Sequence, residues 1–141
     1  FRFRVHIKSQ RKLWSNLKGL TNRRKIIELE EWKRKLKYAI VGWVNYYKLA
    51  DMWKFLERTD EWLRRRIRMV ILKRWKRVRT KYKNLRQLGI SHENARRQAN
   101  SRKGLWRSAD TPVIHQALNN ERLARNGFTF LLPRYEAVGI S

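Results

Sequence analysis

Four arginine side chains are concentrated in the middle of the chain, in the segment 64–68. A planar guanidinium can donate two parallel hydrogen bonds to phosphate oxygens, so this residue type in this pattern indicates a polyphosphate ligand. The surrounding segment from Glu61 to Arg86 contains twelve Lys or Arg residues against one acidic residue, with Trp62, Trp75 and Tyr82 among them. A fully solvated charged face is the alternative for these arginines. The pattern favours phosphate contact and therefore a nucleic-acid partner.

The charge of the whole chain agrees with this interpretation. Its 141 residues include 36 Lys or Arg and 11 Asp or Glu, a formal net charge of +25, which nucleic-acid phosphates would neutralise. Hydrophobic residues make up 42%, with seven Trp, while Gly and Pro are few, so a packed core is predicted rather than a disordered basic tail. Without cysteine, the chain has no disulfide and no thiolate metal site. No apolar run approaches the ~20 residues of a membrane span, and no membrane partner is expected.

Residues for catalysis or metal binding are sparse. Nucleases and polymerases that use Mg²⁺ need clustered carboxylates, yet the only adjacent acidic pair that includes an aspartate is Asp60-Glu61, which we interpret as helix surface charge. The three histidines are isolated, and the sequence has no glycine-rich phosphate loop or nucleophile motif. We therefore predict no catalytic residue and no metal ligand in this chain.

The apolar periodicity predicts a mainly α protein. Residues 1–8 alternate between apolar and polar types, which indicates a short N-terminal strand that enters a helix near Ser9, where Leu13, Leu17 and Leu20 mark one face. A second helix is indicated by apolar residues at steps of three and four, and a third follows after Asp51. We predict a helical bundle with two long helices side by side and short helices appended to them. The apolar stripe of the second helix is Leu29, Trp32, Leu36, Ala39, Trp43, Tyr46 and Ala50.

The third helix and the segment after it also carry local signals. The side of the third helix opposite its apolar residues is expected to face water or ligand. It carries Lys54, Arg58, Glu61, Arg65 and Arg68.

Beyond Arg79, turn and cap residues predict short helices and an apolar tail pinned by its aromatic rings. These signals are Gly89 as a C-cap, Ser91 as an N-cap, Gly104 as a helix stop, Thr111-Pro112 as a helix start, Gly127 as the last helix stop, and Phe128 to Tyr135 as the tail.

One set of motifs resembles a known family. The string Gly42-Trp43-Val44-Asn45-Tyr46-Tyr47, followed by the arginine-rich residues 62–68, resembles the maturase-specific region, called domain X or thumb, of group II intron reverse transcriptases. The segments 75–77, 85–89, 101–107 and 117–127 follow in the order which that family shows. The resemblance covers nearly all of the chain. Residues 1–8 are similar to the exit from the palm, 9–78 to the thumb-like bundle, and 79–141 to a maturase module of short helices.

The resemblance implies the C-terminal piece of a protein that helps its intron RNA fold and splice and that reverse-transcribes this RNA during intron mobility. The implied partners are group II intron RNA, the RNA/DNA primer-template duplex, and upstream finger and palm domains. No Tyr-x-Asp-Asp motif occurs here, so polymerase activity is expected only of a parent protein, with Mg²⁺ required there and by the RNA. No cofactor is expected in this piece. The implied location is the bacterial cytoplasm or an organelle.

The candidate site residues divide into two sets. Gly42, Trp43, Tyr46, Tyr47 and Trp106 are predicted as a core or structural motif, although the rings could instead stack on bases, and Trp106 is open between the two. Asn45 could bond to backbone or to RNA. A general basic architectural or ribosome-associated protein is the alternative function. The predicted RNA-binding residues are Lys8, Arg11, Lys12, Lys18, Arg23, Arg24, Lys25, Arg64, Arg65, Arg68, Lys73, Lys76, Arg77, Arg79, Lys81, Arg102, Lys103 and Arg107.

Overall fold

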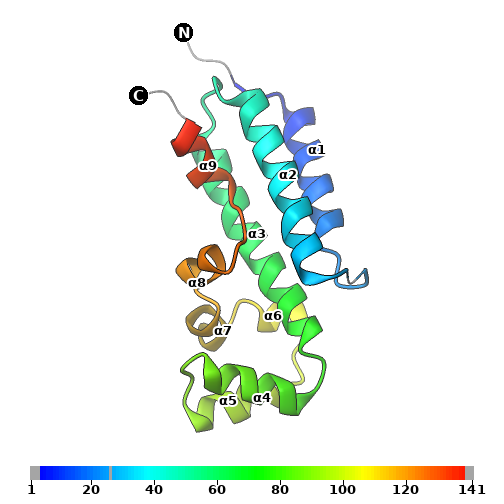
Figure 1. Ribbon diagram of the computed structural model, residues 1–141, viewed down its shortest axis with the longest axis vertical. Helices are drawn as coiled ribbons and strands as arrows, with labels where there is room; N and C mark the ends of the chain where they lie inside the picture. The colour runs from blue at the N-terminus through cyan, green and yellow to red at the C-terminus, as the bar shows by residue number, and fades with distance from the viewer. Residues whose placement is uncertain (1–3, 26, 139–141) are drawn as a thin grey trace. The chain divides into compact units, whose positions relative to one another are not determined.

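The computed structural model describes residues 4–25 and 27–138, and every regular element in this part of the chain is an α-helix (Figure 1). The predicted mainly α fold class is confirmed. Three helices are long and the others have ten residues or fewer. The helices are α1 Ile7–Leu20, α2 Leu29–Tyr47, α3 Trp53–Arg74, α4 Val78–Gln87, α5 His92–Ala99, α6 Leu105–Ser108, α7 Pro112–Ala117, α8 Asn120–Arg125 and α9 Leu131–Val138.

The N-terminal strand prediction is wrong for the described residues. Helix α1 already begins at Ile7, because the imidazole Nδ1 of His6 accepts a hydrogen bond from the backbone N of Lys8 at 3.1 Å and so caps the helix. Val5 is nevertheless buried, as its apolar type predicts. Phe1 and Phe3, the other two apolar residues near the start of the alternation, lie outside the described residues.

The chain divides into two compact units. The first contains the chain up to Leu63 and the chain from Asn126 onward, and the second is Arg64–Arg125. Helix α3 contributes residues to both. The sequence predicted a boundary after residue 78 and placed the tail in the second module, whereas in the structure the tail belongs to the first unit.

Helices α1, α2 and α9 build the first unit together with the N-terminal part of α3. Helix α1 lies beside α2, and α9 packs against α2 (Figure 1). Leu13 and Leu17 of α1 are buried, as predicted. Trp32 of α2 is 2% exposed; its indole N donates to the carbonyl of Leu20 at 2.7 Å, and its ring meets that of Phe128 edge-on, with centroids 5.1 Å apart. The predicted pinning of the tail by its aromatic rings is confirmed here.

The buried face of α2 begins where the sequence predicted and then follows another line. Trp32, Leu36, Ile40 and Val44 are buried, at steps of four, instead of the predicted steps of three and four through Ala39, Trp43 and Tyr46. A step of four residues turns the face by about 40° each time, so the buried line winds around the helix. The long helix α2 therefore presents a second, exposed face in its C-terminal half.

Helix α9 is held at its N-terminus by a carboxylate from α3. Asp60 is 1% exposed, and its two oxygens accept hydrogen bonds from the backbone N of Leu131 and of Leu132, each at 2.8 Å. The interpretation of Asp60 as surface charge is therefore wrong, although its neighbour Glu61 is exposed. The carboxylate satisfies two N–H groups that the first turn of any helix leaves without a partner in that helix.

In the second unit, α4 and α5 form a helical hairpin (Figure 1). Gly89 has φ +90° and terminates α4, while the backbone N of Ile90 donates to the carbonyl of Leu85 at 3.0 Å. Ser91 caps α5, since its hydroxyl accepts from the backbone N of Asn94 at 3.3 Å. The predicted N-cap at Ser91 is confirmed, whereas the C-cap of α4 is Leu88, one residue before the predicted Gly89.

The remaining turn signals are confirmed with two exceptions. Thr111 and Pro112 start α7 as predicted. Gly127, with φ +97°, follows α8, but the prediction that it ends the last helix is wrong, because residues of the predicted tail form α9. Gly104 is not a stop but the N-cap of α6, because its ψ of 159° is extended and its carbonyl accepts from the backbone N of Ser108 at 2.9 Å. Glycine is favoured at both ends of helices, so its presence alone does not show whether a helix begins or ends there.

Candidate nucleic-acid interface

Helix α1 presents one basic face. Lys8, Arg11, Lys12 and Lys18 are all exposed and lie opposite the buried leucines of this helix. No acidic residue occurs in α1, so none of these charges is neutralised within the helix. We call these four residues the α1 basic face.

The basic character continues past the end of α1. Arg24 and Lys25 are exposed and Arg23 is half-buried in the turn that follows. The side chain and carbonyl of Asn22 accept hydrogen bonds from the backbone N of Arg24 at 2.9 Å and of Lys25 at 3.1 Å, which fixes the turn. The predicted residues Arg23, Arg24 and Lys25 therefore lie on an ordered turn, which follows the helix of the α1 basic face in the sequence.

Arg68 does not lie on the surface, so its prediction as a phosphate-binding residue is wrong. It is 2% exposed; its Nε donates to the carbonyl of Leu118 at 2.7 Å, and its Nη2 donates to the side-chain oxygen of Asn120 at 2.9 Å. Burial lowers the pKa of this guanidinium, which remains charged in proteins. Arg68 therefore links α3 to the end of α7 and to the first residue of α8.

The side chain of Arg65 also makes its contacts within the protein. Its guanidinium lies 3.8 Å from the centre of the Trp106 ring, and its Nε and Nη2 donate to the carbonyl of the same residue at 3.0 and 2.9 Å. These contacts favour the structural alternative for Trp106, and the donors that make them are not available for the phosphate contact predicted for Arg65. A stacked arginine occupies the ring face that a base would need.

A carboxylate and an imidazole complete the surroundings of Arg65. Its Nη1 lies 3.8 Å from Asp110, and Nε2 of His115 lies 2.9 Å from the other oxygen of this carboxylate. The hydrogen bond with His115 holds the pKa of the Asp110 carboxyl below its usual value, and the charge of Arg65 adds to this effect. Arg64, the remaining predicted residue of the run, is half-buried.

The second unit carries its exposed charges at the end of α3, in the following turn and along α4. Lys73, Lys76, Arg77 and Arg79 are exposed, and no acidic residue occurs between Glu61 and Glu93. Lys76 has φ +40°, a left-handed conformation that is costly for a residue with a side chain and often marks functional turns. Lys83, one turn beyond Arg79, extends the exposed line. We call these five residues the α3–α4 basic turn.

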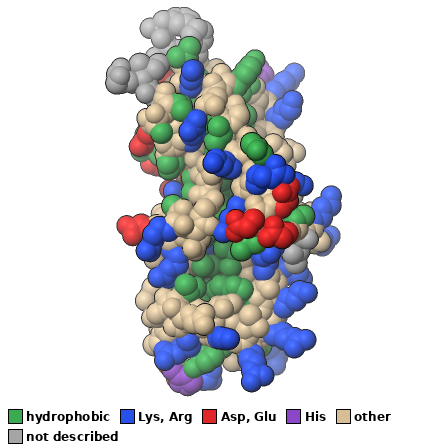
Figure 2. All heavy atoms as spheres, in the orientation of Figure 1, with side chains coloured by type: hydrophobic (Ala, Val, Ile, Leu, Met, Phe, Trp, Pro, Cys, Tyr) green, Lys and Arg blue, Asp and Glu red, His purple; other side chains and the backbone are tan. Residues whose placement is uncertain are grey.

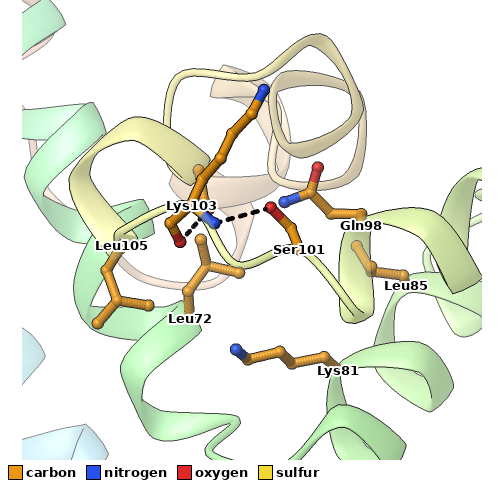
Figure 3. A pocket seen from close by; sticks show the side chains of 8 residues that line it. Leu72, Lys81, Leu85, Gln98, Ser101, Lys103 and Leu105 are labelled. Carbon is orange, nitrogen blue, oxygen red and sulfur yellow. Dashed lines mark hydrogen bonds between the residues drawn. The ribbon is translucent and has the colours of Figure 1, made fainter.

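Lys81 and Lys103 line a small pocket in the second unit with Leu72, Leu85 and Leu105 (Figure 3). The cavity of about 20 Å³ has room for about one water molecule and not for a nucleobase. The backbone N of Lys103 donates to the hydroxyl of Ser101 at 3.2 Å, and the side chain of Lys103 extends away from Leu72 and Leu85 (Figure 3). Lys81 is half-buried here, whereas the side chains of Arg102, Lys103 and Arg107 are exposed.

Other exposed cations are already neutralised by neighbouring carboxylates. Glu31 is paired with Arg34, and Glu93 accepts from both Arg96 and Arg97 at 3.1 Å. These hydrogen bonds hold the pKa values of both glutamates below their usual value. On the face seen in Figure 2, acidic side chains gather in a few places while Lys and Arg are widely spread. The α1 basic face and the α3–α4 basic turn are therefore the strongest candidates for phosphate contact.

The aromatic motif of α2 divides between two faces. Trp43 and Tyr47 are half-buried, with ring centroids 4.6 Å apart, and the hydroxyl of Tyr47 donates to that of Ser9 at 2.9 Å, contacts that favour the predicted structural role. Tyr46 is 80% exposed, so its prediction as core is wrong. Gly42 is exposed too, and a Cβ built on it would meet nothing within 4 Å, so no other described part of the chain approaches closely there.

The sequence interpretation missed Tyr38. Its side chain is 65% exposed, and the guanidinium of Arg34 lies 5.2 Å from its ring centre. The available signal was its spacing, since Tyr38 and Tyr46 lie four residues before and after Gly42.

The described residues contain no group of three or more His, Cys, Asp or Glu side chains placed to hold a metal ion. Among the helices of residues 4–25 and 27–138, none has the length and apolar character needed to cross a membrane.

A stripe of Lys and Arg along a helix is the electrostatic feature expected of a nucleic-acid-binding surface. The sequence pattern of the family described as "Group II intron, maturase-specific domain" matches residues 10–89, which is more than half of the chain. The chain belongs to this family, as its motifs predicted. No curated protein matches the chain by sequence.

Proposed function

We propose that this chain is a non-catalytic RNA-binding domain that grips group II intron RNA during splicing. The observation that carries the proposal is the pair of carboxylate-free basic surfaces, on α1 and on the α3–α4 basic turn, in a member of the maturase-specific family. Each cation that contacts a phosphate releases a counterion, so such surfaces drive binding to RNA.

A role in a larger protein follows from the same proposal. In the parent, a palm that carries the polymerase centre and its Mg²⁺ would precede this domain, and the domain would act as a thumb on the RNA/DNA primer-template duplex during intron mobility. The basic face of α1 supports this role, because cations along one side of a helix can follow the backbone of a duplex.

The test is a salt series of binding by the 141-residue chain to its intron RNA and to a scrambled RNA of equal length. An advantage of about tenfold for the intron RNA at moderate salt supports the maturase role. Coincident curves would contradict it and favour the alternative, a general basic architectural protein that recognises only the RNA backbone.

The residues are tested with two double variants that remove the same charge. Arg11→Gln with Lys12→Gln removes two cations from the α1 basic face, and the slope of log K against log salt should fall by about 1.4, or about 0.7 for each lost contact. Arg96→Gln with Arg97→Gln removes two cations that already bond to Glu93 and should change the slope much less. Equal changes in both variants would contradict the assignment of α1.

A further inference from the structure

Helix α1 carries a large aromatic side chain at an exposed position. Trp14 is 43% exposed, although tryptophan is highly buried on average. Successive residues are turned by about 100° around a helix, so Trp14 lies about 60° from the buried Leu17 and about 40° from the exposed Lys18. The ring therefore lies at the border between the core and the α1 basic face.

The core side of this ring is fixed by three residues of α3. The indole N of Trp14 donates a hydrogen bond to the hydroxyl of Thr59 at 2.8 Å, and Thr59 is 0% exposed. Phe55 stacks on the ring with centroids 5.8 Å apart and an angle of 27° between the planes. Trp62 lies 6.4 Å away at a tilt of 39°. A ring that is held in this way loses little conformational freedom when a ligand covers its exposed side.

Two cations of α1 flank the exposed side of Trp14. Arg11 lies three residues before it and Lys18 four residues after it, and residues at these spacings are neighbours on one side of a helix. Both side chains are exposed, and α1 contains no acidic residue. The aromatic ring is therefore set between a guanidinium and an ammonium group.

Helix α3 adds a third cation near the ring. Arg58 is exposed, directly precedes Thr59 and lies about one helical turn before Trp62. Glu57 and Glu61 each lie two residues from Thr59, which turns them by about 160° to the other side of α3. Positive charge from two helices therefore borders the ring, and this favours a polyanion over an apolar peptide as its ligand.

We propose that Trp14 is a stacking platform for one unpaired nucleobase, while Arg11, Lys18 and Arg58 hold the phosphates on either side of that nucleotide. This inference rests on the proposed RNA-binding function and names the state of the nucleotide that this part of the surface recognises. A base inside a duplex is already stacked on its neighbours, whereas an unpaired base can place its whole face on an aromatic ring. Because every base has such a face, the platform accepts any sequence.

The test compares three nucleic acids that are bound by the complete chain. The first is a single RNA strand of about twelve nucleotides, within the range of single-strand site sizes. The second is an abasic strand with the same number of phosphates, and the third is a blunt duplex of the first strand. The wild type should bind the base-bearing strand about tenfold more tightly than the abasic strand. The two salt slopes should be equal, because the two strands offer the same phosphates.

Three variants assign this advantage to one ring. Trp14→Leu keeps an apolar side chain but no ring, and it should lose most of the advantage of the base-bearing strand. Trp14→Phe keeps a ring and should retain part of that advantage. Trp53→Leu is the matched control, because Trp53 is 45% exposed at the start of α3 and should leave the affinity unchanged. All three variants should bind the abasic strand and the duplex like the wild type.

The inference is overturned if Trp14→Leu binds the base-bearing strand as tightly as the wild type, which would leave the ring to a protein partner. An equal loss on the abasic strand, or an equal loss in Trp53→Leu, would also overturn it. If Trp14→Leu does not fold, the wild type still decides, since equal affinity for the base-bearing and abasic strands contradicts base stacking. All these results leave the proposed function standing, whereas a wild type that binds no RNA would contradict the proposed function itself.

Discussion

Replacing Asp60 with alanine should destabilise the first unit strongly. The substitution removes the carboxylate that accepts hydrogen bonds from Leu131 and Leu132, and it leaves both backbone N–H groups without this partner. Leu131 is 0% exposed, so its N–H cannot easily find water, whereas Leu132 is half-buried. An unsatisfied buried donor costs about 1–3 kcal/mol, so about 2 kcal/mol for the first and about 1 kcal/mol for the second give a loss of about 3 kcal/mol.

The assay is urea unfolding followed by circular dichroism. With a slope of about 1.5 kcal/mol/M, a loss of about 3 kcal/mol lowers the midpoint by about 2 M. Asp60→Asn keeps one acceptor oxygen and should lose about half as much free energy of unfolding. Hydrogen exchange gives a local readout, because the amides of Leu131 and Leu132 should be protected in the wild type and exchange rapidly in Asp60→Ala.

Glu61→Ala is the matched control. It removes the same charge from the next residue of the same helix, but Glu61 is exposed, so its free energy of unfolding should change by about 0.5 kcal/mol or less. Each substitution removes one negative charge from a chain of net charge +25 and so adds repulsion among its cations. Because the added repulsion is similar in both variants, it cancels in the comparison. The reasoning is refuted if the unfolding midpoints of Asp60→Ala and Glu61→Ala coincide.

Two further predictions concern the second unit. Arg68→Ala should lower its free energy of unfolding by about 3 kcal/mol, because the carbonyl of Leu118 and the amide oxygen of Asn120 lose a charged donor; urea unfolding measures this, and an unchanged midpoint contradicts it. Asp110 has a folded-state pKa below its usual value, so its stabilising contribution is present above pH about 4 and is lost as the pH falls through the folded-state value. The difference in thermal midpoint between wild type and Asp110→Asn should therefore shrink from pH 7 to pH 3, and a constant difference would show that the His115–Asp110 bond has no such effect.

Short-range signals in the sequence were reliable because their partners lie within one helical turn. The hydroxyl of Ser91 bonds to the amide three residues ahead, and Gly89 needs only its own backbone freedom to terminate α4. Thr111 and Pro112 likewise start α7 by their own conformations. Gly104 shows the limit of such signals, since a glycine beside a helix marks a boundary without saying on which side the helix lies.

Periodicity predicted that α2 is a helix but not which of its sides is buried. Tyr46 fits a stripe of alternating steps of three and four, yet it is 80% exposed, because the line of contact passes through Ile40 and Val44. The buried side of α2 depends on the two helices that pack against it, α1 and α9, and not on the α2 sequence alone. Helix α9 is more than eighty residues further along the chain than α2, beyond the reach of a local pattern.

The candidate interface was overestimated where charged residues of α3 serve the ends of short helices. Arg65 and Arg68 bond to carbonyls 41 and 50 residues away, and Asp60 bonds to an amide 71 residues away. Every helix leaves up to four amides at its start and four carbonyls at its end without partners in the helix. In a short helix these groups are most of the backbone amides and carbonyls. A long neighbouring helix can supply charged side chains to these groups, carboxylates to the starts and guanidiniums to the ends. In a basic chain with many short helices, some charged side chains therefore stabilise the fold instead of binding a ligand. These side chains lie on the long helix, at positions that the apolar pattern predicts to be exposed. Helices α1 and α4 contain no acidic residue, and each is followed by a turn. Their basic side chains are therefore better evidence for RNA contact than the denser arginine run of α3.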